Sequence, residues 1–312
     1  MKLVSYRCKS ESSVYRIGFI QKDKVTDLQE SYRLLLLHRK EDALVSSLES
    51  LFPADPTRFF KNGEKAMAMA REAHQFISKQ SVYEEVSYPR EKVMLGPPIA
   101  DPGKIICVGK NYADHAKEMD SALPEYPVLF SKFSNALIGP EDVIEKSPQT
   151  NQLDYEVELV VVIGREASQV SQSEAYNYIA GYTIGNDVTA RDMQNRTSQW
   201  LQGKSIDRST PIGPWVVTSD EMVNPENLNI ASFINGEKRQ ASTTNQFIFN
   251  IPFLIEYISH LITLQPGDII LTGTPDGVGV AMNPPQFLVE HDQITLEIEG
   301  IGKLENKVTE RK

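Results

Sequence analysis

Residues 154–164 read DYEVELVVVIG, and residues 181–192 read GYTIGNDVTARD. The first stretch places Glu156 and Glu158 two positions apart in a run of valine, leucine and isoleucine. Residues i and i+2 of a β-strand project from the same face, so we expect the two carboxylates to point the same way. The second stretch interrupts its own apolar pattern with Asp187, which could supply a third oxygen ligand.

Like charges this close raise each other's pKa unless a cation lies between them. An all-carboxylate set suits a hard cation such as Mg²⁺ or Mn²⁺, whereas zinc more often takes histidine or cysteine. The alternative is that Glu156 and Glu158 form the solvated face of an ordinary amphipathic strand, because exposed acids on strands are common. The other motifs of the chain bear on this choice.

The composition is that of a globular protein with about two domains. Its 312 residues carry a formal charge of −10, which argues against nucleic acid and anionic membrane surfaces as partners. No apolar run reaches membrane-spanning length, and the N-terminal segment lacks the apolar region of a secretory signal. Cys8 and Cys107 lie far apart and suggest neither a disulfide framework nor a zinc site. We therefore expect a cytoplasmic protein.

The chain changes character near residue 95. Before it, short strands are expected at 2–6, 14–21 and 25–28, and helical spacing covers 32–50 and 63–78. Residues 81–103 are rich in proline and glycine, which favours an extended connection. Beyond it, short β-rich runs recur with few helical patterns between them. The sequence thus predicts an α+β, β-dominated protein with a small N-terminal α+β domain (1–95) and a catalytic domain (96–312).

A second candidate site follows the segment KIICVGK (104–110). His115 and Glu118 are three residues apart and share one face of a short predicted helix. A carboxylate beside an imidazole orients it and stabilises its protonated form, which is the arrangement of a general base. The alternative is a surface salt bridge, which is the commoner fate of such a pair.

A third group of candidates lies between residues 187 and 208. Lys204 follows Gly203, where a flexible backbone would let its ammonium approach an anionic substrate; an exposed turn lysine is the alternative. Arg191 and Gln194 follow Asp187 by four and seven residues, so that a helical turn would bring them near the acids to bind a second carboxylate. Arg191 could equally pair with a neighbouring acid.

A fourth candidate is PGDIILTGTPDGVG (266–279), a predicted strand that ends in a glycine-rich loop. Its glycines allow backbone amides to face an anion, and Thr274 adds a hydroxyl group. The phosphate-binding pattern GxxxxGK[ST] is absent. Taken alone, this segment would be a hairpin turn.

In chain order these segments resemble the fumarylacetoacetate hydrolase family from about residue 104 to the C-terminus. The similarity rests on six ordered segments: KIICVGKNYADHAKEM, PVLFSK, LDYEVELVVVIG, GYTIGNDVTARDMQ, GKSIDRSTPIGP and LTGTPDGVG. Val108 departs from the pattern, because larger family members have an aspartate ligand there. Arg208 also departs, because it replaces a small residue.

The resemblance implies a mixed β-sandwich or β-roll catalytic domain, a homodimer, and Mg²⁺ or Mn²⁺ held by three acids. It implies a helical lid that carries a water-activating dyad, together with an active-site lysine and a substrate-loop threonine. The residues concerned are Glu156, Glu158 and Asp187 for the metal, His115, Glu118 and Lys204 for catalysis, and Thr274 for the substrate.

The members that the chain resembles include oxaloacetate decarboxylases and acylpyruvate hydrolases. The resemblance therefore implies cleavage of a C–C bond in a small 2-oxo acid or dicarboxylate through a metal-bound enolate. A tautomerase or 2-hydroxymuconate-type isomerase would use the same site without cleaving a bond. A metal-dependent dicarboxylate-binding or scaffold protein is a further alternative, although a binder needs the acids and not the base.

Overall fold

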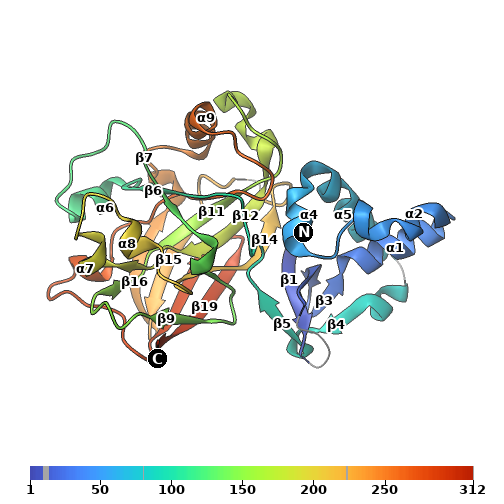
Figure 1. The fold of residues 1–312 in the computed structure, drawn as a ribbon, viewed down its shortest axis with the longest axis horizontal. Coiled ribbons are helices and arrows are strands. Elements are labelled where there is room, and N and C mark those ends of the chain that lie inside the picture. Colours follow the sequence, from blue (N-terminus) through green and yellow to red (C-terminus); the bar gives the residue numbers. More distant parts are fainter. Residues whose placement is uncertain (10–13, 80, 223, 312) are drawn as a thin grey trace.

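A large mixed sheet runs through the molecule and contains strands from both the N-terminal region and the rest of the chain (Figure 1). The computed structural model describes residues 1–9, 14–79, 81–222 and 224–311. The strand order of the main path is β4 (Ser87–Pro89), β3 (Lys24–Asp27), β2 (Arg16–Gln21), β1 (Lys2–Cys8), β14 (Thr210–Thr218), β12 (Ile179–Asn186), β11 (Val157–Ile163), β17 (Ile269–Leu271), β6 (Ile105–Gly109) and β7 (Val128–Lys132). Off this path, β5 (Val93–Gly96) pairs with β1, and β8 (Leu137–Ile138) pairs with β14.

A second sheet of five strands accompanies the first. Its order is β16 (Glu237–Thr243), β15 (Asn229–Ile234), β18 (Gln293–Ile298), β19 (Gly302–Glu310) and β9 (Val143–Lys146), and a separate short pair is formed by β10 (Leu153–Asp154) and β13 (Thr189–Ala190). Alternate residues of β11, such as Leu159 and Val161, share one apolar core with side chains of this second sheet. The predicted β-dominated α+β fold is confirmed.

The other face of β11 packs against the N-terminal region. Val160 and Val162 share a core with apolar side chains of the N-terminal helices. These helices are α1 (Leu28–His38), α2 (Asp42–Ser46), α3 (Leu48–Leu51), α4 (Pro56–Lys61) and α5 (Gly63–Ile77). Strand β1 also pairs with β14, with Leu3 opposite Val216. The two regions thus share a sheet and a core, and the proposed division near residue 95 stays a prediction.

The helical spacing over 32–50 corresponds to three helices, because the chain forms α1, α2 and α3 in this region. Helix α1 ends at His38, and Lys40, two residues further on, has a left-handed φ of 60°. The Lys40 amide donates to the Leu37 carbonyl and the Glu41 amide to the Leu36 carbonyl, which is the Schellman pattern of a helix end. Apolar spacing continues across this point, so it does not reveal the break.

The remaining helices are short, and several lie near the acids. They are α6 (Ala113–Glu118), α7 (Arg191–Gln194), α8 (Leu201–Lys204) and α9 (Ile251–Leu261), with 3₁₀ turns η1 (Ser81–Val86), η2 (Arg90–Lys92), η3 (Ser134–Ala136), η4 (Gln172–Tyr178), η5 (Thr244–Gln246) and η6 (Gly279–Ala281). Figure 1 shows α6, α7 and α8 at the opposite end of the molecule from α1 and α2. Within the described ranges, no helix combines the length and apolar character that crossing a bilayer requires.

Candidate active site

The acids predicted from the sequence converge at the edge of the central strands. Glu156 precedes β11, Glu158 lies within it, and Asp187 directly follows β12. The two strands pair with Val157 opposite Asn186, and the Asp187 amide donates to the Glu156 carbonyl at 2.9 Å. One ligand oxygen from each of the three carboxylates lies within 4.8 Å of the other two, and all three side chains are buried.

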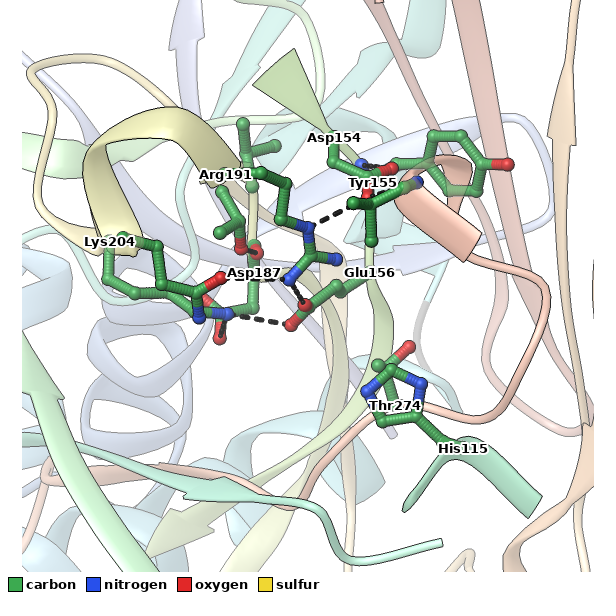
Figure 2. A network of polar contacts seen from close by, with 12 residues as sticks. His115, Asp154, Tyr155, Glu156, Asp187, Arg191, Lys204 and Thr274 are labelled. Atoms are coloured by element: carbon green, nitrogen blue, oxygen red, sulfur yellow. Dashed lines mark hydrogen bonds and ion pairs between the residues drawn. The ribbon is translucent and has the colours of Figure 1, made fainter. Parts of the chain in front are cut away.

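Three cationic side chains contact this cluster, and Figure 2 shows two of them, Lys204 and Arg191. The Lys204 ammonium lies between Glu156 Oε2, at 2.7 Å, and Asp187 Oδ2, at 2.6 Å. Lys132 Nζ donates to Asp187 Oδ1 at 2.8 Å, and Arg191 Nη1 lies 2.8 Å from Glu156 Oε1. Burial alone would raise the pKa of Glu156, but Lys204 and Arg191 outweigh it and lower that pKa to about 2.

Glu158 is held differently. Its Oε2 accepts a hydrogen bond from the Gly273 amide at 2.7 Å, and no cationic side chain of the described residues lies within ion-pair distance of it. Burial raises the pKa of Glu158 well above its usual range, and the negative charges of Asp187 and Glu156 raise it further. The cluster therefore contains one carboxylate whose charge the protein does not balance.

The donor set fits a hard divalent cation. Four buried acids face three buried bases, so the cluster has a formal surplus of one negative charge when all four acids are ionised; the acids are Asp154, Glu156, Glu158 and Asp187, and the bases are Lys132, Arg191 and Lys204. A divalent ion would convert this surplus into one positive charge, which the carboxylate of a substrate would then neutralise. Carboxylate oxygens are also the ligands that Mg²⁺ and Mn²⁺ prefer.

His115 and Glu118 lie side by side on α6. His115 Nδ1 is 3.3 Å from Glu118 Oε2, and the other Glu118 oxygen accepts from the Gly277 amide at 2.9 Å. Gly277 has a φ of 95°, and a Cβ atom there would lie 2.2 Å from the Arg239 carbonyl oxygen, so a glycine is required. His115 is 7% exposed and lines the same cavity as the acids. The structure thus places His115 in the wall of the cavity, with Glu118 beside it, and the pair is not an exposed surface salt bridge.

Arg191 and Gln194 lie on the short helix α7 and line the same cavity. The Arg191 guanidinium binds Asp154 at 2.8 Å, Glu156 at 2.8 Å and the Gln194 amide oxygen at 3.2 Å. Arg191 Nη2 is buried and has no hydrogen-bond partner among the described residues. Most of the guanidinium is therefore taken up by the protein, and only Nη2 is left for the substrate carboxylate that Arg191 was expected to bind.

Thr274 and Lys204 are both buried, and the protein holds each in place by hydrogen bonds. The Thr274 hydroxyl donates to the Val157 carbonyl at 2.9 Å and accepts from the Gln240 amide at 2.8 Å, so it fixes the glycine-rich loop against β11. Lys204 ends helix α8 and is 2% exposed, which excludes the alternative of an exposed turn lysine. Both side chains border the cavity.

Two buried charged residues of the cluster escaped the sequence analysis. Lys132 lies 55 positions from Asp187, and Asp154 lies 37 positions from Arg191. The available signal was weak: a lysine that ends an apolar run, and a third acid two positions before Glu156. A fully buried lysine requires an acidic partner, but only the fold reveals which one.

A cavity of about 250 Å³ opens beside the acids. The three acids and His115 border it on one part of its wall, and Phe130 and Trp200 supply aromatic surface. A strand-rich fold with a buried acidic cluster, a histidine–glutamate pair and an adjoining cavity defines an enzyme-like site for a small anionic molecule.

Comparison with known proteins identifies the family. The model of the fumarylacetoacetate (FAA) hydrolase C-terminal family matches residues 104–309. The chain belongs to the fumarylacetoacetate hydrolase family, which confirms the resemblance inferred from the sequence.

Two curated relatives are oxaloacetate tautomerases. Fahd2a, mitochondrial, of Rattus norvegicus is 42% identical over 265 residues, which cover 85% of this chain and 82% of the relative. YisK of Bacillus subtilis (strain 168) is 40% identical over 296 residues, which cover 93% and 94%. The family and these relatives support an enzyme that acts on a small acid.

Solved structures agree with this assignment. A putative HpcE protein from Mycobacterium smegmatis has a TM-score of 0.81 at 31% identity and covers both chains completely. Maleylpyruvate hydrolase from Sphingobium sp. SYK-6, solved with a manganese(II) ion and pyruvate, has a TM-score of 0.75 at 25% identity with the same coverage. That complex and the buried acids of this chain support a divalent-metal site.

Proposed function

We propose that the chain is a divalent-metal-dependent tautomerase that interconverts the keto and enol forms of oxaloacetate or a closely related 2-oxo dicarboxylic acid. The observation that carries the proposal is that one cavity is bordered both by the three acids and by His115. Curated tautomerases that match 85% and 93% of this chain support the choice of reaction.

Tautomerisation makes few demands on the site. One proton moves between C3 and the 2-oxo oxygen, no C–C bond breaks, and no water is needed as a nucleophile. A divalent cation held by Glu156, Glu158 and Asp187 would bind the substrate's carboxylate and 2-oxo oxygens and stabilise negative charge on the latter. His115, with Nδ1 directed at Glu118, would carry the proton.

The surrounding residues hold these groups in place. Lys204 and Lys132 fix Asp187, while Lys204 and Arg191 fix Glu156, so the acids have defined positions before a substrate binds. Glu118 is itself fixed by the Gly277 amide, which keeps the imidazole oriented. Phe130 and Trp200 line the cavity with aromatic surface, which would help to exclude water once a substrate is bound.

C–C cleavage, which the sequence analysis placed first, now becomes the second candidate. Hydrolysis of an acylpyruvate needs His115 to activate a water, and decarboxylation of oxaloacetate needs only the stabilised negative charge. The maleylpyruvate hydrolase complex with manganese and pyruvate supports this candidate at 25% identity. The scaffold alternative is disfavoured because His115, paired with Glu118, lines the cavity and a binding protein would not need this pair.

The test separates the three reactions by their products. Pure protein is supplied with Mn²⁺ and enol-oxaloacetate, and keto-oxaloacetate is detected with malate dehydrogenase and pyruvate with lactate dehydrogenase. We expect accelerated formation of the keto form without matching pyruvate, and loss of the effect in Glu156→Ala and with a chelator. Rapid release of pyruvate from oxaloacetate or from acetylpyruvate, with no acceleration of the tautomer exchange, would replace the proposal with decarboxylation or hydrolysis.

A further inference from the structure

A 2-oxo dicarboxylic acid has a second carboxylate, and the acidic cluster cannot bind it. The cavity is bordered by three cationic side chains, Lys110, Arg191 and Lys204. Arg191 and Lys204 are each paired with buried acids at 2.6–2.8 Å. The protein's own carboxylates therefore largely neutralise the positive charges of Arg191 and Lys204.

Lys110 is the exception. Its ammonium donates to the Ser121 hydroxyl at 2.6 Å, and within the described part of the chain no carboxylate lies within ion-pair distance of it. A hydroxyl group can orient an ammonium without neutralising its charge. Lys110 is partly buried, so an anion that enters the cavity would meet this charge with less screening than at an open surface.

The backbone holds Lys110 in a defined orientation. Its φ of 57° lies in the left-handed region, which residues other than glycine seldom adopt. Gly109 before it ends β6 in register with Val128, and a Cβ atom on Gly109 would lie 2.6 Å from the Trp200 ring. Asn111 after it is anchored by side-chain hydrogen bonds to the Phe249 and Thr272 backbones. The surrounding structure thus imposes the unusual conformation.

Ser121 connects this lysine to the helix that carries the proton-transfer pair. The Ser121 amide donates to the Ala116 carbonyl at 2.9 Å, so the serine is fixed at the end of α6. A carboxylate bound by the Lys110 ammonium, which Ser121 holds in place, would therefore lie near the end of the helix that carries His115 and Glu118.

We infer that Lys110, oriented by Ser121, binds the distal carboxylate of the substrate and so makes the enzyme selective for 2-oxo diacids over 2-oxo monoacids. The inference rests on the proposed function, because it names the class of substrate that the same cavity accepts. It assigns to Lys110 the binding of the second carboxylate, a role that the sequence suggested for Arg191.

The kinetic test uses a pair of substrates that differ only in the distal charge: oxaloacetate and its 4-methyl ester. In Lys110→Met we expect kcat/KM for oxaloacetate to fall about tenfold or more, mainly through KM, while the value for the ester stays unchanged. Lys110→Arg should recover most of the loss. Lys117→Met, which removes an exposed charge from α6 outside the cavity, is the matched control and should behave like the wild type.

A binding test does not depend on turnover. Calorimetry on the Mn²⁺-loaded protein compares malate with 2-hydroxybutyrate, which keeps the metal-binding end and replaces the distal carboxylate with a methyl group. We expect the wild type to prefer malate about tenfold, Lys110→Met to lose that preference, and oxalate to bind both proteins equally. Equal affinity of the wild type and Lys110→Met for malate would overturn the inference. If the wild type prefers malate through Lys110 yet exchanges no tautomers, the proposed function fails while the diacid site stands.

Discussion

Two buried carboxylates in this molecule, Asp27 in the N-terminal region and Glu158 in the candidate active site, have opposite surroundings. Asp27 accepts from the Tyr6 hydroxyl and Arg16 Nε, both at 2.5 Å, from Arg16 Nη2 at 3.1 Å and from the Glu30 amide at 2.8 Å. Glu158 accepts one hydrogen bond, from Gly273, and has no cationic partner among the described side chains. The protein itself satisfies the hydrogen bonds and the charge of Asp27. It supplies no counter-ion for Glu158 among the described side chains, which leaves this carboxylate able to bind a cation.

This contrast has an energetic meaning. A paired buried carboxylate contributes to stability because its hydrogen bonds and its counter-ion offset the loss of water. An unbalanced one costs stability, and it persists only where binding or catalysis requires it. Mutations at the two positions should therefore change stability in opposite directions and activity at only one of them.

The largest expected effect is on activity at Glu158. Glu158→Gln keeps an acceptor for the Gly273 amide but removes the charge that would hold the cation, so kcat/KM should fall by at least about 10³-fold. The variant without metal should be more stable than the wild type by about 1 kcal/mol, because repulsion from Asp187 and Glu156 is relieved. Steady-state kinetics and urea unfolding measure these two quantities, and Mn²⁺ titration measures how tightly the variant binds the cation.

The control for this substitution is Glu174→Gln, which removes an exposed acid. It should change neither activity nor stability by a measurable amount. If Glu158→Gln binds Mn²⁺ as tightly as the wild type, the acidic cluster is not the metal site and the contrast with Asp27 loses its explanation.

The next largest effect is on stability at Asp27. Asp27→Asn leaves the Arg16 guanidinium without its counter-ion, and we expect the free energy of unfolding to fall by about 2–3 kcal/mol. Burial and the neighbouring Asp27 raise the pKa of Tyr6 well above its usual value, so the phenol stays protonated and keeps donating. Urea unfolding measures the loss, and kcat of the folded variant should stay within about twofold of the wild type. A large fall in kcat under conditions where the variant is fully folded would show that the N-terminal region and the candidate active site are coupled.

A smaller effect on activity is expected at Glu118. Glu118→Gln can still accept from the Gly277 amide but no longer offers His115 a negative charge, so kcat should fall about tenfold with little change in KM. The estimate is modest because the His115–Glu118 contact is long, at 3.3 Å. Asp114→Asn on the exposed face of α6 is the matched control. A rise in KM alone would mean that Glu118 positions the substrate and takes no part in proton transfer.

The sequence could predict the parts of the site that follow a local pattern, but not the pairings between distant residues. The acids were found because the i, i+2 spacing within a strand is a local pattern, and the six ordered segments placed them in a family. The counter-ions Lys132 and Asp154 were not found, because their partners lie 55 and 37 positions away and only the sheet brings them together. Arg191 illustrates the same limit: its position near the acids was predicted, but its pairing with Asp154 was not.

Helix ends show a second limit of the sequence. The apolar spacing of residues 32–50 predicts helix but not the break within it, where the chain turns at Lys40 in a conformation that favours glycine. Periodicity reports which face of a segment is buried, and it does not report where the backbone changes direction. For the same reason the orientation of Lys110, also left-handed, could not be inferred from its neighbours in the sequence.

The smallest expected effect concerns pH and His74 in the N-terminal region. Burial lowers the pKa of His74, and the nearby N-terminal ammonium lowers it further, so the folded protein takes up this proton less readily than the unfolded chain. Above about pH 6.5 both states are neutral and stability is unaffected; below it the unfolded chain is protonated first, and stability falls as the pH drops. The wild type should thus lose up to about 1 kcal/mol more than His74→Gln between pH 7.5 and 5.5, a small value because the side chain is only partly buried. Urea unfolding at both pH values measures it, with the exposed His260→Gln as the control, and equal losses in the wild type and His74→Gln would show that this histidine does not contribute to the acid sensitivity of the fold.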